Sequence, residues 1–378
     1  MKVAIIQNRV IHGGRLRWLS SLISFLNSKA ITPDIISYQM DFDATHILES
    51  FGLKIEFNVK ILSPPKIKLT QEMEIICFNL QVQSKLNEYH CVINSSNSWL
   101  GIANYHNVLH YIHFPRKYRL WNDIHNNGLT KIKQKWYRPI HDSLMRIIYT
   151  LFDRKTPSHV IANSNFTATA ISHLWKQSRC DIIYPPLNEK IIVTKYEDWK
   201  QRSQGYVVLG RFSHEKGQLQ LMKQIKKYSG IFHFIGFADT HSSYYKQCKK
   251  QADSQKNIRL HPNLSNEARN KVLGSVRYYV HTTINEPFGL SIIESLSQGL
   301  LPIIHSSGGA KEIITESVLQ YQQMSDLPIL LDSLLSTTDI EKHELLSNIQ
   351  LRCNKLFGMD SFTEQFRSQL SIFDKLEI

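Results

Sequence analysis

Residues 285–299, NEPFGLSIIESLSQG, form the most informative stretch of the chain. Pro287 suits the first turn of a helix, where its missing N–H removes no hydrogen bond. Gly299 is a typical helix stop before the apolar run that follows it. Glu286 and Glu294 are eight residues apart, and a helical rise of about 1.5 Å per residue separates them by about 12 Å. Capping alone would explain a glutamate at a helix start, but this span also suits an elongated anionic ligand with its phosphates at the helix N-terminus.

A longer pattern surrounds this stretch. Glu-Pro-Phe-Gly-Leu at 286–290 is followed by Glu294, Gly299, Pro302 and then GGAKEII at 308–314. The order and spacing resemble the donor-binding signature of family-4 retaining glycosyltransferases. The resemblance implies that Glu286 lies beside the donor sugar and Glu294 on the ribose hydroxyls. It adds the helix start, Phe288, Gly289 and Leu290, to the donor site.

A second pattern lies after the expected strand 206–209. It reads GRFSHEKG, residues 210–217, and begins with Gly210. The planar guanidinium group of Arg211 can donate two hydrogen bonds to phosphate oxygens at once, whereas the ammonium group of Lys216 acts as a compact positive charge. The spacing matches the diphosphate-binding loop of the same family, so Arg211 and Lys216 are expected to bind the donor and to act in catalysis. The alternative is a pair of surface cations at a strand end.

Weaker signals extend the donor site. Gly13 and Gly14 follow the first expected strand, 2–7, and a glycine turn before a helix is a common anion-binding arrangement. In the family such a loop borders the donor diphosphate. Gly236 and Pro262 fall at strand ends, where open α/β sheets bind ligands.

The segment YIHFP, residues 111–115, ends an apolar strand with a histidine. Together with SHVIANSNFT at 158–167 and YPP at 184–186, it resembles mannosyltransferases of the lipid-linked oligosaccharide type. The resemblance implies that His113 faces the donor sugar and belongs to the catalytic residues. His110, three residues earlier, is expected to be structural.

Composition limits the possible classes of protein. The chain has 378 residues, which favours two domains, and 42% hydrophobic residues, which suits a globular fold. Its five cysteines are widely spaced without a CxxC pair, which favours free thiols in a reducing compartment. The formal net charge of +13 predicts an anionic partner: nucleic acid, a phospholipid surface or a phosphorylated substrate.

Residues 116–155 carry ten Lys or Arg against three Asp, with Trp121, Trp136, Tyr137 and Tyr149 among them. We expect an amphipathic helix over 131–152. Basic and aromatic residues on one helix suit an anionic membrane surface. A solvated helix that packs its aromatic face on the core is the alternative.

Asp41-Phe42-Asp43 fits the DxD pattern with which another glycosyltransferase class binds a divalent metal. Its three residues lie far from the donor signature, so a solvated loop is the expectation. We expect no metal and no cofactor other than the nucleotide-sugar co-substrate.

Alternating strands and helices predict parallel sheets covered on both faces. With the resemblance, the expected fold is α/β of the GT-B type, two Rossmann-like domains that face each other across a cleft. The expected parts are an acceptor-binding domain at 1–190, a donor-binding domain at 204–358 and a C-terminal helix, 359–378, that returns to the first domain. Residues 188–203 are the expected hinge, and residues 75–80 are expected to be a strand.

The function implied is transfer of a hexose, mannose from GDP-mannose, with retention of configuration onto a glycan or lipid-linked acceptor. UDP-glucose and UDP-N-acetylglucosamine stay open as donors. No protein nucleophile is evident, so the resemblance implies attack by the acceptor hydroxyl on the same face as the departing phosphate. A cytoplasmic, membrane-peripheral location follows from the basic stretch. The competing class is a non-catalytic basic scaffold on the same fold, although no nucleic-acid-binding signature is present.

Overall fold

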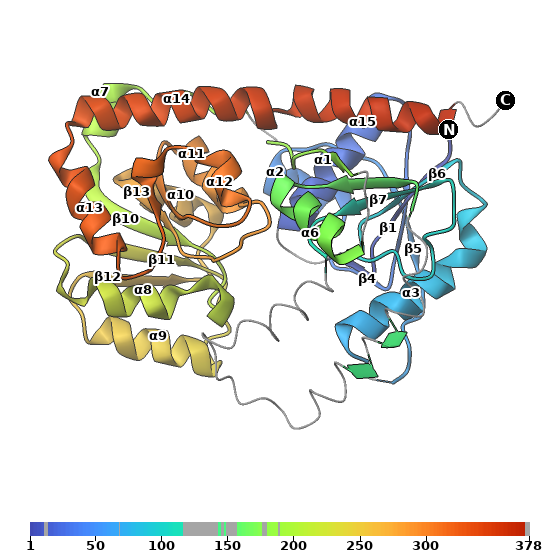
Figure 1. Ribbon diagram of the computed structural model, residues 1–378, viewed down its shortest axis with the longest axis horizontal. Coiled ribbons are helices and arrows are strands. Elements are labelled where there is room, and N and C mark those ends of the chain that lie inside the picture. The colour runs from blue at the N-terminus through green and yellow to red at the C-terminus, as the bar shows by residue number, and fades with distance from the viewer. Residues whose placement is uncertain are drawn as a thin grey trace. The chain divides into compact units, whose positions relative to one another are not determined.

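The computed structural model describes residues 1–10, 14–67, 69–115, 143–144, 147–148, 157–175, 180–187 and 190–374. The chain divides into two compact units, Met1–Asn188 with Met359–Ile378, and Glu189–Gly358. Each unit is built on a parallel sheet with helices packed against it (Figure 1). The predicted class, α/β with parallel sheets, is therefore confirmed.

The described part of the first unit has a seven-stranded parallel sheet in the order β5-β3-β1-β6-β7-β8-β9. Its strands are β1 (Val3–Ile6), β3 (Asp34–Ser37), β5 (Asn58–Ile61), β6 (Cys91–Asn94), β7 (Val108–Ile112), β8 (His159–Ala162) and β9 (Asp181–Ile182). The short strands β2 (Arg9–Val10) and β4 (Gln39–Met40) pair separately. Helices of its described part are α1 (Gly14–Ser28), α2 (Ala44–Phe51), α3 (Gln71–Leu86), α6 (Asn165–Trp175) and α15 (Met359–Asp374).

Both faces of this sheet are covered. Val3 and Ile5 of β1 belong to one core with residues of α1 and α15, whereas Ala4 and Ile6 belong to another with residues of α3. Alternate side chains of a strand point to opposite faces, which explains why β1 is apolar at every position. The chain's last helix, α15, contributes a stripe at helical spacing to the first core: Phe362, Phe366, Leu370 and Phe373.

The expected strand at residues 75–80 is wrong, because this run lies inside α3. The Thr70 hydroxyl caps that helix by accepting a bond from the Met73 N–H at 3.4 Å. Ile75 and Phe78 are buried, and Phe78 packs in the core that contains Ile6. A short apolar run cannot be assigned to strand or helix by periodicity alone, so the cap was the better signal.

The described part of the second unit has a six-stranded parallel sheet in the order β12-β11-β10-β13-β14-β15. Its strands are β10 (Ser203–Leu209), β11 (Phe232–Gly236), β12 (Ile258–Pro262), β13 (Val276–His281), β14 (Leu301–His305) and β15 (Gln320–Tyr321). The α-helices are α7 (Tyr196–Lys200), α8 (Gln218–Gln224), α9 (Ser243–Asp253), α10 (Asn266–Ser275), α11 (Leu290–Ser297), α12 (Ala310–Ile313), α13 (Leu327–Ser336) and α14 (Asp339–Phe357).

The strand order reverses between β10 and β13. The chain runs outward from β10 through β11 to β12, and then returns to β13 on the other side of β10. In open α/β sheets, the loops that follow the two strands at such a reversal diverge and leave a crevice at their carboxyl ends. The loops after β10 and β13 are therefore where a ligand of this unit is expected.

The expected hinge at 188–203 needs correction, because its described part belongs to the second unit. The side chain of Asn354 on α14 bonds both backbone groups of Ile191, at 2.7 and 2.8 Å. Gln350, also on α14, accepts from the Thr194 N–H at 3.0 Å. Polar composition suggested a linker, but these polar groups are satisfied by a helix that lies some 150 residues later in sequence.

Among the described helices, none combines the length and the apolar character needed to cross a membrane.

Candidate active site

The loops after β10 and β13 are joined by direct contacts. The loop after β10 ends in a short 3₁₀ turn, η1 (His214–Lys216), and Gly217 follows it with a left-handed φ of 67°. The hydroxyl of Thr282, the first residue after β13, donates to the carbonyl oxygen of Lys216. A Cβ on Gly217 would lie 3.0 Å from the Thr282 carbonyl oxygen, so glycine allows this close approach.

An ion pair is formed where these loops meet. Lys216 Nζ lies 2.8 Å from Glu286 Oε2, and the two side chains are 26% and 19% exposed. Burial raises the pKa of Glu286, but the charge of Lys216, the neighbouring His281 and hydrogen bonds from Lys216 and Thr283 together outweigh it, and the net pKa lies below the usual range. The carboxylate is therefore charged at neutral pH. The ammonium group has three N–H donors, so it can bond this carboxylate and a phosphate oxygen together.

The backbone of Glu286 is fixed by the glycine pair 308–309. Gly309 N–H donates to the Glu286 carbonyl oxygen at 2.8 Å, and the Ser307 hydroxyl accepts from the Asn285 N–H at 2.8 Å. A Cβ on Gly308 would lie 2.5 Å from the carbonyl oxygen of Glu286, and one on Gly309 would lie 2.3 Å from the carbonyl oxygen of Pro287. The GG pair in the sequence pattern is thus required by close packing on the Glu286 loop.

Glu286 lies in this loop and not in a helix, which corrects the helix expected from Pro287 onward. The helix α11 begins at Leu290, and Gly289 precedes it with a φ of 117°. Gly299 follows its end with a φ of 74°, as expected of a helix stop. The helical-rise estimate of the separation between Glu286 and Glu294 therefore does not apply. Phe288 is buried with its ring 5.3 Å from that of Phe357, so its side chain belongs to the core.

Glu294 lies on α11 and forms an ion pair with Arg269, a residue that the sequence analysis did not predict for the site. Its Oε2 accepts from Arg269 Nη2 at 2.8 Å, and both side chains are close to 30% exposed. Arg269 lies on α10, 25 residues earlier, among other polar surface positions. No local spacing connects the two residues, so only the folded sheet shows the pairing.

Arg211 is a solvent-exposed member of the predicted site. Its side chain is 62% exposed and its Nη2 lies 2.7 Å from Glu215 Oε1. Exposed pairs of this kind contribute little to stability, roughly 0–1 kcal/mol. Its backbone is held more firmly, because Gln218 Nε2 donates to the carbonyl oxygen of Arg211 at 2.8 Å.

Gly210, Gly236 and Pro262 lie at neighbouring strand ends. Gly236 and Pro262 pair in register between β11 and β12, and a Cβ on Gly236 would lie 2.0 Å from the Gly210 carbonyl oxygen. Gly236 is therefore needed for the close approach of β11 to the loop that carries Arg211. Its predicted role in donor binding stays a prediction.

Gly236→Ala is expected to lower the free energy of unfolding by about 1–3 kcal/mol, because the backbone oxygen it meets cannot turn aside. The matched control is Gly274→Ala on α10, where a Cβ meets nothing within 4 Å. Alanine in a helix is favoured over glycine, so the control should be stabilised by up to about 1 kcal/mol. Urea denaturation measures both, and equal stability of the two variants would contradict the steric argument.

In the first unit, His113 lies directly after β7. Its Nε2 is 2.9 Å from Ser95 Oγ, and its backbone N–H donates to Asn97 Oδ1 at 2.9 Å. Burial, with a contribution from Arg15, holds the pKa of His113 well below its usual range, so the ring is neutral. Gly14 begins α1, and Gly13 lies outside the described residues. His110 is fully buried with its Nδ1 2.9 Å from Asn94 Nδ2, which fits the structural role expected for it.

His281 is a site neighbour that the sequence reading passed over. It ends β13, is 2% exposed, and its Nε2 lies 3.9 Å from Glu286 Oε2. Burial lowers the pKa of His281 to about 4. Its position at the carboxyl end of a strand beside the reversal was a usable signal, because ligand sites gather there.

The DxD pattern at 41–43 and the helix expected at 131–152 are the two remaining sequence features. Asp43 Oδ1 accepts from the His46 N–H at 2.8 Å and caps α2, which explains one carboxylate of the DxD pattern as helix capping. The helix expected at 131–152 falls almost entirely outside the described residues, as does the rest of the basic stretch 116–155.

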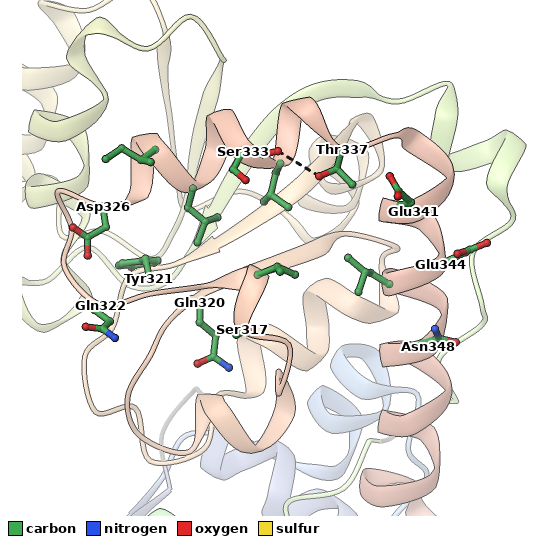
Figure 2. A pocket seen from close by; sticks show the side chains of 15 residues that line it. Ser317, Gln320, Tyr321, Gln322, Asp326, Ser333, Thr337, Glu341, Glu344 and Asn348 are labelled. Carbon is green, nitrogen blue, oxygen red and sulfur yellow. Dashed lines mark hydrogen bonds between the residues drawn. The ribbon is translucent and has the colours of Figure 1, made fainter.

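A hollow of about 800 Å³ lies elsewhere on the second unit (Figure 2). It is lined by β15, α13 and α14, and Asp326, Glu341 and Glu344 lie around it. None of the sequence-predicted site residues lines it. The Tyr321 hydroxyl donates to the His281 carbonyl oxygen at 2.8 Å, so one residue of its lining also supports β13.

Comparison with known proteins finds a family match within the second unit. Residues 195–326 match the model of the family "Glycosyl transferases group 1". A relative from Mus musculus, GDP-Man:Man(3)GlcNAc(2)-PP-Dol alpha-1,2-mannosyltransferase, is 25% identical over 170 residues, which cover 40% of this chain and 35% of the relative. Relatives of the same name from Yarrowia lipolytica and Candida albicans are 24% and 21% identical. The matches span only about a third of the length of these relatives.

Solved structures resemble the whole chain. Sucrose-phosphate synthase from Thermosynechococcus elongatus has a TM-score of 0.74 at 14% identity, with both chains fully covered. The Anabaena protein HepE, solved with UDP and glucose, has a TM-score of 0.70 at 17% identity, covering 98% of this chain and 99% of its own. The chain therefore has the GT-B fold, and residues 195–326 of its second unit match the glycosyl transferases group 1 family.

Proposed function

We propose that this chain is a retaining glycosyltransferase that transfers mannose from GDP-mannose to a glycan or lipid-linked acceptor. The observation that carries the proposal is the Lys216–Glu286 ion pair of 2.8 Å at the sheet's reversal point. It lies within the region that matches the group 1 family. The pair places a cation that can bind a diphosphate, Lys216, beside a carboxylate that can bind a sugar, Glu286.

The chemistry asks for stabilisation of negative charge on the leaving diphosphate. Lys216 and Arg211 supply positive charge, and the N-terminus of α11 adds its dipole. The bond between the anomeric carbon and the diphosphate oxygen breaks, and the acceptor hydroxyl oxygen bonds that carbon on the same face. Its proton passes to the departing phosphate oxygen, so no protein nucleophile is used.

Mannose is favoured over other sugars by the curated relatives, whose names specify GDP-Man as donor. UDP-glucose and UDP-N-acetylglucosamine are the second candidates, since HepE was solved with UDP and glucose. We place the nucleobase near the strand ends at Gly236 and Pro262, and these two residue types do not distinguish a guanine from a uracil.

The test is a donor-turnover screen with the purified 378-residue chain against GDP-mannose, UDP-glucose and UDP-N-acetylglucosamine, read as release of nucleoside diphosphate. We expect release from GDP-mannose above the other two. Tight nucleotide binding without turnover of any donor would favour the non-catalytic alternative instead.

The screen is run with and without excess EDTA, because we propose that no divalent metal is needed. Among the described residues, no cluster of three or more His, Cys, Asp or Glu is placed to hold one. In this proposal the side chains of Arg211 and Lys216, in place of a metal ion, neutralise the charge of the diphosphate. Activity lost in EDTA and restored by Mn²⁺ would overturn this part of the proposal.

Glu294→Ala is expected to raise KM for the donor about tenfold or more while kcat changes little, because hydrogen bonds to a charged group contribute roughly 1.5–3 kcal/mol. The carboxylate is fixed on α11 by Arg269 and is proposed to accept from the ribose hydroxyls. Donor titrations measure the effect. Arg269→Ala should give a smaller change in the same direction, and an unchanged KM in Glu294→Ala would exclude the ribose role.

We also propose that the chain acts at a membrane surface with anionic lipid, on its cytoplasmic side. The support is compositional, ten Lys or Arg within residues 116–155. A basic residue near such a surface contributes about 1 kcal/mol, so a few suffice for reversible binding.

Binding to anionic vesicles should fall steeply with salt, because the screening length drops to about 3 Å at 1 M. Changing Lys131, Lys133 and Lys135 to Glu should weaken co-sedimentation. The control changes the exposed lysines of α9, Lys246, Lys249 and Lys250, to Glu, which alters the net charge equally. Equal loss in both variants, or no vesicle binding by the wild type, would contradict a specific membrane-binding stretch.

A further inference from the structure

The loop that carries Glu286 is held by residues 307–309 at two points. One is a contact between backbones, in which the Gly309 N–H donates to the Glu286 carbonyl oxygen at 2.8 Å. The other uses a side chain, because the Asn285 N–H donates to Ser307 Oγ at 2.8 Å. Asn285 has a left-handed φ of 54°, which is uncommon outside glycine and has to be held by its surroundings. The Ser307 hydroxyl holds the chain there, one residue before Glu286.

The Ser307 hydroxyl is itself fixed in place. His305 Nδ1 lies 2.8 Å from Ser307 Oγ, and the Ser307 N–H donates to the His305 carbonyl oxygen at 2.7 Å. The His305 ring lies nearly perpendicular to the ring of Tyr321 on β15, with the ring centroids 5.4 Å apart. A hydroxyl group has one hydrogen and two lone pairs, so it can accept from Asn285 whether His305 Nδ1 carries a proton or not. The contact with the Glu286 loop is therefore independent of the histidine tautomer.

We propose that Ser307 is a positioning residue for the Glu286 carboxylate. Its hydroxyl fixes the backbone of Asn285, and the side chain of the next residue reaches Lys216, whose Nζ lies 2.8 Å from Glu286 Oε2. The inference rests on the proposed function, because Glu286 needs accurate placement only if it lies beside the donor sugar. A diphosphate would then compete for the ammonium group of Lys216. A carboxylate that loses part of its ion pair keeps its place only if its backbone is held independently, and Ser307 does this.

The neighbouring serine, Ser306, offers a matched control. Its hydroxyl donates to Gln320 Oε1 at 3.0 Å, and its N–H donates to the Tyr321 carbonyl oxygen at 2.7 Å, so these bonds go to the β15 segment. Both serines are partly buried. Ser306→Ala and Ser307→Ala therefore each remove a hydroxyl group from the same turn, but only the second removes a contact with the Glu286 loop.

We expect Ser307→Ala to lower kcat about tenfold or more with little change in donor KM, because displacing a reacting group by about 1 Å can reduce a rate about 100-fold. Ser307→Thr keeps the hydroxyl group and should recover most of the loss. Ser306→Ala should leave kcat unchanged. Thermal unfolding confirms that each variant is folded at the assay temperature, so a loss of rate is not a loss of folded protein.

A readout independent of turnover is the pKa of Glu286, measured by ¹³C NMR on glutamate-labelled chain with Glu286→Gln as the assignment reference. Burial raises this pKa, and the groups that face the carboxylate lower it, foremost Lys216 and then His281 and Thr283. A carboxylate that moves away from Lys216 loses the largest of the lowering effects. The measured pKa should therefore rise in Ser307→Ala.

The same titration in Ser306→Ala should give the wild-type pKa of Glu286. An unchanged pKa or an unchanged kcat in folded Ser307→Ala would overturn the inference and leave the glycosyltransferase function standing. Equal losses of kcat in the two alanine variants would also overturn it, because the turn would then have only a general structural role. Absence of turnover by the wild type would instead defeat the proposed function, and the pKa comparison would still decide whether Ser307 positions the carboxylate.

Discussion

Replacing Lys216 by alanine is expected to lower kcat by about two to three orders of magnitude, because removing one preorganised group that stabilises developing charge has effects of that size. Lys216 is 26% exposed and its carbonyl oxygen is held by Thr282, so its ammonium group acts from a fixed loop. The substitution also leaves Glu286 without its cation. Rates are measured at saturating donor to separate kcat from binding.

The control is Lys223→Ala on α8, an exposed lysine of the same region that makes no contact with Glu286. It should leave kcat unchanged. Arg211→Ala is expected to be impaired as well, although its guanidinium already pairs with Glu215 and is more exposed. Near-normal turnover in both the Lys216 and Arg211 variants would remove the assignment of the diphosphate site to this loop.

The sequence placed this loop directly after the strand that ends at Leu209, as the structure has it, because its pattern is local. Residues 210–217 contain both cations and the glycines that the turn needs, so order and spacing were sufficient. Glu286 and the glycine pair 308–309 belong to one sequence pattern as well, but only the structure shows that the Gly309 N–H bonds the Glu286 carbonyl oxygen. Short patterns with several fixed positions are informative because each position has a separate steric or charge requirement.

Contacts between distant segments could not be predicted in this way. Arg269 pairs with Glu294 across 25 residues, and Asn354 holds Ile191 across 163. Both depend on which helices the sheet order brings together, and no local propensity encodes that order. His281 is a similar case, because its relation to Glu286 depends on the path of the loop between them and not on their spacing of five residues.

The error in α3 has a different origin. Residues 75–80 are apolar enough for either a buried strand or a buried helix, and the helix is selected by its Thr70 cap and by packing of Phe78 in the core with Ile6. Likewise, Pro287 was taken to start a helix that in fact begins at Leu290. In this case the intervening loop is what presents the Glu286 carboxylate to Lys216.

Replacing Glu286 by glutamine is the second change with a large expected effect. Glutamine keeps the size and one acceptor oxygen but removes the negative charge, and we expect kcat to fall by about two orders of magnitude or more, in line with losses of oriented electrostatic groups. Donor KM should change little, because the ribose contact is assigned to Glu294. The exposed Glu267 of α10 provides the control, since Glu267→Gln removes one charge from the same unit without touching the site.

The pH profile separates charge from shape in this substitution. Lys216 lowers the pKa of Glu286 below its usual value, so the wild-type carboxylate stays charged as pH falls toward the ordinary glutamate range of about 4.3. Lys216→Ala removes that stabilisation, so the acid loss of its residual activity should move to higher pH, because burial, which raises the pKa of Glu286, is then opposed less. Glu286→Gln should show no acid loss from this group. If free nucleotide binding weakened in Glu286→Gln and not in Glu294→Ala, the two carboxylates would have exchanged roles, and the sugar would lie at the helix end of the site.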